Sequence, residues 1–374
     1  MKLLMLNNEY PPLGGGQANA NYYLYKEFEK YKDIQIDIIT SSTNEYKEQN
    51  TKIGKIYFLD IGKKDKNLHF QTSKELITYS LKSLSLAKRL IKQNKYDIIV
   101  AWSGVPAGYL AYRLNKKFNL PYIVLLRGSD VPFWEKRWYY LDKFIFSWLS
   151  PKIWKNATKT IANSKGLKEQ ALNVAPTQKI EVIFNGIDLK DFKPSNNNNK
   201  IVKIFSAGRL IPRKSLDLQI KALSQIKSNF SLNIAGDGPE KENLEKLISD
   251  LGMKNKIKLL GMKNKEEMKK LYSDSDIYLF TSKNEGMSNT ILEAMASGLP
   301  IITTNVAGVE ELIKGNGFII GVDNESELKD KLDTLIKNKS LRNKMGNKSR
   351  KLAEQMSWSK IAKSFYTKFK EIKK

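Results

Sequence analysis

The sequence predicts two α/β domains, each built on a mostly parallel β-sheet with crossover helices. Its 374 residues exceed the size to which one hydrophobic core usually grows. Short apolar runs also alternate with helix-like stretches along the whole chain, a pattern that is typical of parallel sheets. The expected strands are LLMLN, IQIDIIT, KIYFLD, DIIVAW, PYIVLL, TKTIAN and KIEVIF in the first half, and VKIFSAG, FSLNIAG, KIKLLG, DIYLFTS, LPIITT and GFIIG in the second.

A polar segment separates the two halves. Residues 193–200, KPSNNNNK, combine a proline with a polar run, which is the composition of an exposed linker. We therefore expect an N-terminal domain over residues 1–193 and a second domain over residues 200–356. Residues 357–374 are expected to form an amphipathic helix that docks on the body of the protein. The apolar positions of this helix are Trp358, Ile361, Phe365 and Phe369.

The composition excludes several classes of protein and site. Cysteine is absent and His69 is the single histidine, which excludes disulfides, a cysteine nucleophile and a thiolate- or histidine-based metal centre. The apolar run after Lys2 is too short for a signal peptide. The longest uncharged stretch, residues 98–112, is too short to span a bilayer. We expect a cytoplasmic protein without a transmembrane helix.

The formal charge of +25 points to an anionic partner. The excess is spread evenly, however, with +13 over residues 1–195 and +12 over the rest. This favours a compositional background over a dedicated nucleic-acid-binding patch. Attraction to an anionic membrane surface would still follow from the charge.

Candidate site residues follow the expected strands, where parallel sheets bind ligands. The first strand is followed by Gly14, Gly15 and Gly16. Glycines let backbone amides approach a phosphate closely. Neither G-x-G-x-x-G nor the P-loop pattern is present, so a simple tight turn is the alternative.

The segment GRLIPRKS places two cations after the first strand of the second half. Arg209 supplies a rigid fork of donors and Lys214 a point charge, and together they suit a diphosphate. Both would stabilise the negative charge that develops on a departing nucleotide diphosphate. Two solvated charges in a lysine-rich chain are the alternative.

The segment EGMSNTILEAMASG carries two glutamates. Glu285 is expected in the loop before a helix and Glu293 in the second turn of that helix. The amides of Met287, Ser288 and Asn289 would then lie at the helix N-terminus and form an anion site. An ordinary N-cap is the alternative for Ser288 or Asn289.

Taken in order, the segments EYPPLGGG, LRGSDVP, NGID, GRLIPRKS, GDGP and E-x(7)-E resemble the retaining GT-B glycosyltransferases of the large family 4 group. The resemblance covers nearly the whole chain. It implies two Rossmann-like domains facing across a cleft, with the terminal helix crossing back to the N-terminal domain. It also implies transfer of a sugar from a nucleotide-diphosphate donor to a glycan or lipid-linked acceptor, without a metal or other cofactor, in cell-surface polysaccharide or glycolipid synthesis.

The resemblance also assigns roles to individual residues. The family residue that matches Glu285 contacts the donor sugar, and the one that matches Glu293 binds the nucleotide ribose. Those that match Arg209 and Lys214 hold the diphosphate. The pair Gly15-Gly16 approaches the diphosphate from the opposite domain.

One position departs from the family pattern. The family often has histidine where this chain has Arg127, in the segment LRGSDVP. Two hypotheses are open for Arg127: it binds an anionic acceptor, or it forms an ion pair with Asp130. Asp130 is itself a candidate for a catalytic role. The motif SDSD at residues 273–276 resembles an Asp-x-Asp metal site but precedes a strand, so we expect it to end a helix.

The stretch from Trp134 to Lys155 interleaves aromatic and basic residues. A peripheral membrane contact or a site for a lipid-linked acceptor is one interpretation. Core packing is the other, because Trp134, Trp138, Leu141 and Ile145 share one helical face. For the whole chain, the alternatives to a glycosyltransferase are a nucleotide-sugar epimerase of similar architecture and a basic nucleic-acid-binding protein.

Overall fold

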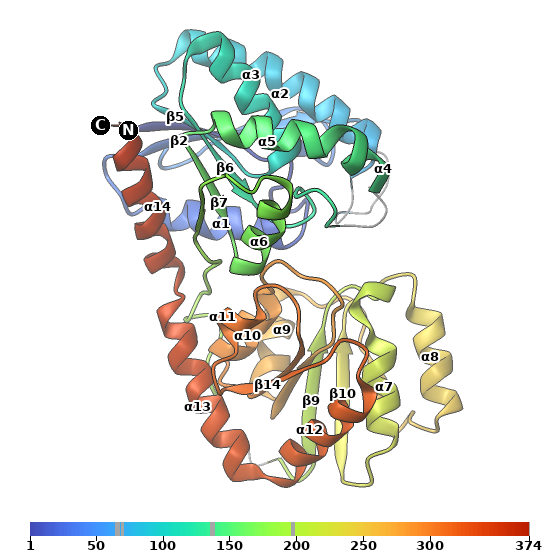
Figure 1. Cartoon of the computed structure of the whole chain (residues 1–374). Helices are drawn as coiled ribbons and strands as arrows, with labels where there is room; N and C mark the ends of the chain where they lie inside the picture. The colour runs from blue at the N-terminus through green and yellow to red at the C-terminus, as the bar shows by residue number, and fades with distance from the viewer. Residues whose placement is uncertain (64–67, 69–70, 135–138, 196–198, 374) are drawn as a thin grey trace. The chain divides into compact units, whose positions relative to one another are not determined.

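The computed structural model describes residues 1–374 apart from 64–67, 69–70, 135–138, 196–198 and 374. The chain divides into two compact units, each with its own sheet and its own apolar core. Unit 1 consists of Met1–Asn185 and Trp358–Lys374, and unit 2 of Gly186–Ser357 (Figure 1). Within the described ranges, no helix is long and apolar enough to cross a membrane. His69, Trp138 and the middle of the expected linker lie outside the described residues.

Unit 1 is built on a sheet with the strand order β3-β4-β2-β1-β5-β6-β7-β8. Its strands are β1 (Lys2–Leu6), β2 (Gln35–Ser42), β3 (Lys47–Asn50), β4 (Lys55–Asp60), β5 (Ile98–Ala101), β6 (Tyr122–Leu126), β7 (Lys159–Ala162) and β8 (Ile180–Val182). Neighbouring strands pair in parallel, except that β3 pairs antiparallel with β4. Every strand expected in the first half is confirmed, and β3 is an addition.

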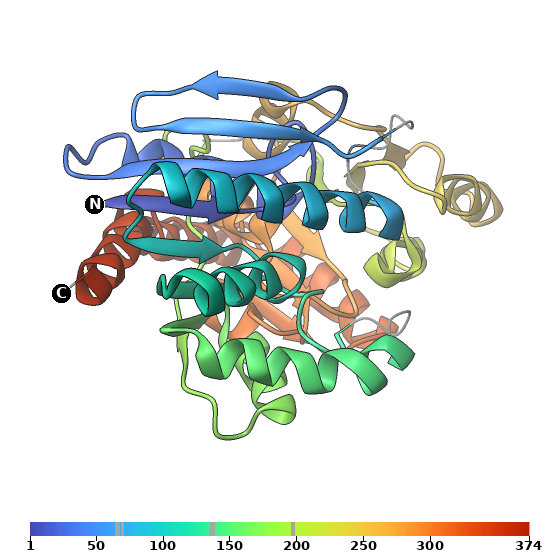
Figure 2. The same ribbon diagram turned by 90° about the horizontal axis from the view of Figure 1, so that it is seen from above.

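Helices cover both faces of this sheet. Its helical elements are α1 (Gly16–Phe28), α2 (Ser73–Gln93), η1 (Gly104–Gly108), α3 (Tyr109–Phe118), α4 (Tyr139–Leu141), η3 (Asp142–Phe146), α5 (Ser147–Asn156), α6 (Lys165–Val174) and α14 (Trp358–Lys373). In the two views, α2, α3 and α5 form a layer on one face, while α1 and α14 pack together on the other (Figures 1 and 2). The terminal helix α14 therefore returns to the N-terminal domain, as the fold class predicts.

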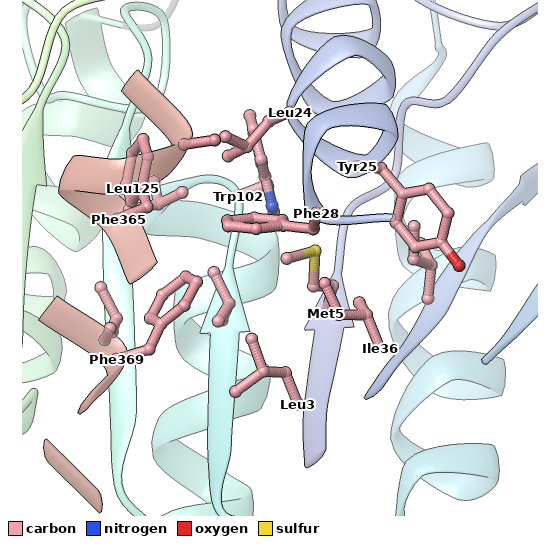
Figure 3. Close-up of a cluster of buried hydrophobic side chains, with 14 of the residues drawn as sticks. Leu3, Met5, Leu24, Tyr25, Phe28, Ile36, Trp102, Leu125, Phe365 and Phe369 are labelled. Carbon is pink, nitrogen blue, oxygen red and sulfur yellow. The ribbon is translucent and has the colours of Figure 1, made fainter. Parts of the chain in front are cut away.

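The core of unit 1 explains why α14 docks there. Its apolar face meets α1 and the strands β1, β5 and β6 (Figure 3). The Phe28 and Phe369 rings lie 5.7 Å apart, and the Tyr23 and Trp358 rings stack at 5.9 Å. Burial of each such ring stabilises the fold by about 2 kcal/mol. The expected apolar positions are all buried, which confirms the amphipathic helix. They are Trp358, Ile361, Phe365 and Phe369.

Unit 2 is built on a wholly parallel sheet with the order β11-β10-β9-β12-β13-β14. The strands are β9 (Val202–Ala207), β10 (Phe230–Ala235), β11 (Ile257–Leu259), β12 (Ile277–Phe280), β13 (Ile301–Thr304) and β14 (Gly317–Ile320). The helices are η4 (Pro212–Lys214), α7 (Leu216–Ser224), α8 (Lys241–Asp250), α9 (Lys265–Ser273), α10 (Asn289–Ala296), α11 (Val309–Leu312), α12 (Glu325–Lys337) and α13 (Lys339–Gln355). Every strand expected in the second half is present.

The change of unit falls at Asn185/Gly186, before the expected linker at residues 193–200. The intervening residues are fixed within unit 2. The Ile187 amide donates to the Met356 carbonyl at 2.9 Å, and the Phe192 ring packs edge-on against Tyr272 at 5.5 Å. The polar composition of residues 193–200 predicted a boundary there. The boundary lies earlier in the chain, because these contacts tie the residues after Asn185 to unit 2.

Candidate functional site

Each sheet has one place where the order of strand addition reverses. In unit 2 the chain adds β10 and β11 on one side of β9 and then places β12 on the other side. Unit 1 has the same reversal between β1 and β5. Loops that leave two such neighbouring strands go to opposite faces of the sheet, and the crevice between them is where α/β sheets bind ligands. The predicted site residues can be located relative to these two points.

The loop after β9 carries both predicted cations. Arg209 is exposed and directly follows Gly208. The next turn, η4, ends at Lys214, whose aliphatic stem passes beside Gly208, since a Cβ there would lie 3.4 Å from the Lys214 Cε. Ser215 adopts a left-handed conformation with φ 45°, which is costly for a non-glycine residue. Thr281 holds this turn by donating from its hydroxyl to the Ser215 carbonyl at 2.9 Å.

Glu285 and Lys214 form an ion pair at the β9–β12 reversal. The Lys214 Nζ donates to the Glu285 Oε1 at 2.5 Å, and the side chains are only 15% and 16% exposed. The Ser282 hydroxyl donates to the same carboxylate oxygen at 3.1 Å. Burial acts to raise the pKa of Glu285, but the charges of Lys214 and Arg213 and the hydrogen bonds from Lys214 and Ser282 together outweigh it and hold that pKa below its usual value. The structure therefore keeps Glu285 ionised beside a cation.

Glu293 has a different environment, although it lies in the same segment. It occupies the second turn of α10, and the Tyr272 hydroxyl donates to its Oε2 at 2.9 Å. Burial raises the pKa of Glu293 to about 7, and the hydrogen bond from Tyr272 opposes this only in part. Glu293 therefore changes charge near neutral pH.

The start of α10 lies between the two glutamates, where the sequence placed it. Asn289 is the first helical residue and Ser288 is the N-cap, whose hydroxyl accepts from the Ile291 amide at 3.4 Å. The side chain of Ser288 therefore performs the ordinary capping role. Met287 precedes the cap and is buried. Binding of an anion by the backbone amides of Met287, Ser288 and Asn289 stays a prediction.

In unit 1, the glycines follow β1 at the other reversal point. Gly15 is the N-cap of α1, and Gly16 is its first residue. A carboxylate already lies here, because the Gly15 amide donates to the Glu9 Oε2 at 3.3 Å. Gly14 has φ 101°, and a Cβ at this position would clash with Glu9. This glycine is thus required by the turn, whereas a Cβ at Gly15 would meet no atom within 4 Å.

Arg127 and Asp130 lie near the same reversal point, after β6. The Arg127 guanidinium stacks over the Trp102 ring at 4.2 Å from its centroid and donates to the Asn185 Oδ1 at 2.9 Å. Burial lowers the pKa of Arg127 to about 10. The side chains of Arg127 and Asp130, both within the described ranges, form no ion-pair contact, so the ion-pair hypothesis for Arg127 is wrong. The charge of Asp130 acts on Arg127 only by opposing the lowering of its pKa.

The Asp130 carboxylate instead joins two loops. It accepts from the amides of Arg127 and Gly128 at 2.9 and 2.7 Å and from the Gly104 amide at 2.7 Å. Burial raises the pKa of Asp130, while these amides act to lower it. The contacts give Asp130 a role in fixing the loops after β5 and β6. A direct catalytic role stays a prediction.

Sequence reasoning missed the residues that orient the predicted ones. Arg213 donates to the Asn284 carbonyl at 2.9 Å and so fixes the loop that carries Glu285. Tyr272 orients Glu293, and Trp102 supports Arg127. Arg213 stands next to Lys214 in the segment GRLIPRKS, and this position could have identified it as a candidate. The two aromatics belong to other elements, and nothing in their own segments indicated their partners.

The motif SDSD has the structural role that was expected. Helix α9 ends at Ser273 with Asp274 as its C-cap. The Asp276 carboxylate accepts from the Lys203 amide at 2.9 Å and thereby fixes the start of β9. Among the residues that the structure describes, no group of three or more acidic, histidine or cysteine side chains is arranged to hold a metal ion.

Two protein families match the two halves of the chain. Glycosyltransferase Family 4 matches residues 14–191, and Glycosyl transferases group 1 matches residues 188–352. An uncharacterized glycosyltransferase of Methanocaldococcus jannaschii is 26% identical over 100% of this chain and 99% of its own length. The alternatives of an epimerase and a nucleic-acid-binding protein gain no support from these matches.

Two further relatives have named activities. An N-acetylgalactosamine-N,N'-diacetylbacillosaminyl-diphospho-undecaprenol 4-alpha-N-acetylgalactosaminyltransferase of Campylobacter jejuni is 32% identical over 60% of this chain and 62% of its own. A UDP-Gal:alpha-D-GlcNAc-diphosphoundecaprenol alpha-1,3-galactosyltransferase of Escherichia coli is 30% identical over 64% and 66%, respectively.

Solved structures show the same fold over the full length. Sucrose-phosphate synthase from Thermosynechococcus elongatus superimposes with a TM-score of 0.85 at 18% identity, covering 100% of this chain and 99% of that one. Anabaena HepE in complex with UDP gives a TM-score of 0.77 at 20% identity, covering 99% and 100%. The solved structures show that the fold is GT-B, and the two family matches, which together span residues 14–352, show that the chain belongs to the glycosyltransferases of the family 4 and group 1 type.

Proposed function

We propose that this chain is a retaining, metal-independent glycosyltransferase that moves a sugar from a nucleotide-diphosphate donor to a lipid-linked glycan. The observation that carries the proposal is the pairing of Lys214 with Glu285 at the β9–β12 reversal point of unit 2. A cation and a carboxylate side by side suit a ligand that combines an anionic diphosphate with a sugar rich in hydroxyl groups.

The donor would occupy unit 2 with each of its parts on a separate side chain. Arg209 and Lys214 would hold the diphosphate, while Glu285 would accept hydrogen bonds from the sugar hydroxyls. Glu293, which lies in α10, the helix that follows Glu285, would bind the ribose. A uracil nucleotide is the first candidate, because the galactosyltransferase relative of Escherichia coli uses UDP-Gal.

The retaining course of the proposed reaction comes from the family resemblance, and the residues above are assigned their roles within it. The acceptor hydroxyl oxygen forms a bond to the anomeric carbon on the face from which the diphosphate leaves, as the bond to the diphosphate oxygen breaks. Arg209 and Lys214 stabilise the negative charge that develops on that oxygen. The departing phosphate takes the proton of the acceptor hydroxyl, so no protein base is required. Glu285 holds the sugar in the reactive orientation.

The acceptor class is proposed from the relatives. The relatives from Campylobacter jejuni and Escherichia coli described above both act on a sugar carried by a diphospho-undecaprenol. An acceptor of this kind would place the chain in the synthesis of cell-surface polysaccharide or glycolipid.

The test is a transfer assay with radiolabelled UDP-sugars and a polyprenyl-diphosphate-linked sugar as acceptor. We expect label in the lipid fraction, an axial product linkage by NMR from an axial donor, and full activity after exhaustive chelation with EDTA. Inversion at the anomeric carbon would contradict the retaining mechanism. Loss of transfer on chelation, restored by Mg²⁺ or Mn²⁺, would contradict metal independence.

A further inference from the structure

One segment of unit 1 exposes an unusual amount of apolar surface. Among the described residues, fifteen large apolar side chains are exposed, and seven of these lie between positions 133 and 148. The most exposed are Tyr140 at 74%, Phe144 at 72% and Trp148 at 67%. The others are Phe133, Tyr139, Leu141 and Ile145. We call these seven residues the aromatic surface. Six of them belong to α4, η3 and the first turn of α5, and Phe133 precedes that segment.

The opposite side of the same segment anchors it to the core. Ile153 and Trp154 of α5 are fully buried. Asp142 is buried as well, and its carboxylate accepts from the Phe133 amide at 2.8 Å. The core-packing interpretation is therefore correct for Trp134, which is 9% exposed, and wrong for Leu141 and Ile145. The aromatic surface is therefore exposed, and buried residues of the same segment anchor it to the core.

The exposed charges of the described residues 139–156, which carry most of the aromatic surface, have one sign. Lys143, Lys152 and Lys155 are exposed, whereas Asp142, the single acidic residue among the described residues from 139 to 156, is buried. The Lys152 Nζ lies over the Trp148 ring at 5.0 Å from its centroid. Lysine stems can lie along apolar surface while their ammonium groups reach outward.

We propose that the aromatic surface binds the interface of an anionic lipid bilayer. Tyrosine and tryptophan rings favour the boundary between acyl chains and headgroups, because they join an apolar body to a polar tip. The three lysines would gain attraction to anionic headgroups. A protein partner would have to match the exposed lysines of residues 139–156, a described stretch in which no acid is exposed, whereas an anionic bilayer offers negative charge over its whole surface. The binding does not depend on the identity of the donor or the acceptor.

The first experiment separates this surface from the general positive charge of the chain. The full chain is mixed with sedimentable vesicles of either phosphatidylglycerol and phosphatidylcholine or phosphatidylcholine alone. We expect it to pellet with the anionic vesicles, much less with the neutral ones, and to be released as salt screens the lysines. The test variant replaces Tyr140, Phe144 and Trp148 with Ser. The matched control replaces three exposed apolar residues of unit 2 with Ser, namely Ile201, Leu251 and Met262.

Both variants keep the net charge, so charge alone predicts equal binding. We expect the test variant to lose about tenfold or more in vesicle affinity and the control to bind as the parent does. Circular dichroism and the thermal midpoint confirm that both variants are folded. Equal binding by the two variants would overturn the proposal, and concentration-dependent self-association that the test variant abolishes would assign the surface to a second copy of the chain instead.

A second pair of variants tests the lysines. Replacement of Lys143, Lys152 and Lys155 with Gln lowers the net charge by three, and the same change at Lys241, Lys254 and Lys258 of unit 2 is the control. We expect the first variant to lose its preference for anionic vesicles and the control to keep most of it. Equal losses would show that the overall charge, and not this surface, recruits the chain.

A conservative variant gives a readout that is independent of affinity. Trp148 is 67% exposed, whereas the other described tryptophans are at most 9% exposed. In a Trp138→Phe background, which removes the one tryptophan outside the described residues, bromine on the acyl chains of the vesicle lipids should therefore quench the fluorescence of the chain mainly through Trp148. Trp148→Phe should still bind but show much weaker quenching. Quenching that is unchanged in this variant would place Trp148 outside the bilayer and contradict the proposal.

Discussion

Glu285 and Glu293 belong to one short segment, yet their surroundings act on their charges in opposite directions. Lys214 and Arg213 hold the pKa of Glu285 below its usual value. Glu293 has a neutral tyrosine as its hydrogen-bond partner, and burial raises its pKa to about 7. The charge of the partner, and not the depth of burial, therefore decides which carboxylate stays ionised.

The difference suits the two proposed tasks. A permanent carboxylate at Glu285 can orient sugar hydroxyls and also hold the Lys214 ammonium for the diphosphate. A carboxyl group that ionises near neutrality at Glu293 makes binding of the ribose sensitive to pH. Variants of the two glutamates and of their partners test this contrast.

The largest effect is expected for Glu285→Gln. This change keeps the shape but removes the charge that orients both the sugar and Lys214, so kcat should fall by about a hundredfold or more. Steady-state transfer assays measure it, with the thermal midpoint as a check on folding. Turnover equal to that of the parent would remove Glu285 from the sugar site.

Lys214→Gln should have the next largest effect. The leaving diphosphate loses one of two cations, and transfer should fall by roughly ten- to a hundredfold. The pKa of Glu285 should also rise, because Lys214 is the larger of the two charges that lower it. The control is Lys221→Gln, which removes a lysine that pairs with Asp217 on the surface of α7. Equal activities of the two variants would contradict the role of Lys214.

Glu293→Gln should change the pH dependence of nucleotide binding. The ionised carboxylate is the stronger acceptor for ribose hydroxyls, and it protonates as the pH falls through about 7. The affinity of the parent for UDP should therefore weaken by a few-fold between about pH 8 and pH 6, relative to the variant, in which this group does not titrate. Calorimetry at both pH values measures the difference, and the variant corrects for titration of UDP itself. Parallel pH profiles would be evidence against Glu293 as the ribose partner.

Tyr272→Phe should have the smallest effect. It removes the hydrogen bond that opposes the burial of the Glu293 carboxylate, so the pKa of Glu293 should rise further. The midpoint of the pH dependence should move to higher pH, while kcat with saturating donor changes little. The measurement is the same calorimetric profile, and an unmoved midpoint would show that Tyr272 only fills space.

Much of the fold could be predicted because buried parallel strands are short apolar runs, as in IVKIFSAG and DIYLFTS. Strand β3 could not, because Lys47–Asn50 is polar and fully exposed. This strand is held by antiparallel pairing with β4 and by an ion pair between Lys55 and Glu48 at 2.8 Å. A pattern based on burial gives no signal for such an edge strand.

The placement of the candidate site residues in loops after strands could be predicted, but the contacts among them could not. Loops after strands are visible in the sequence, and they located Arg209, Lys214 and Glu285. The Lys214–Glu285 bond joins residues 71 positions apart, and it depends on β9 and β12 being neighbours in the sheet. The same applies to Arg127, for which the sequence offered Asp130 as a partner while the fold supplies Trp102 and Asn185.

The most direct test of the whole assignment is a crystal structure of the chain with UDP bound. The diphosphate should lie against Arg209 and Lys214 at the carboxyl ends of β9 and β12, and the ribose hydroxyls should bind the Glu293 carboxylate. A nucleotide bound elsewhere, with the Lys214–Glu285 pair left untouched, would contradict the account.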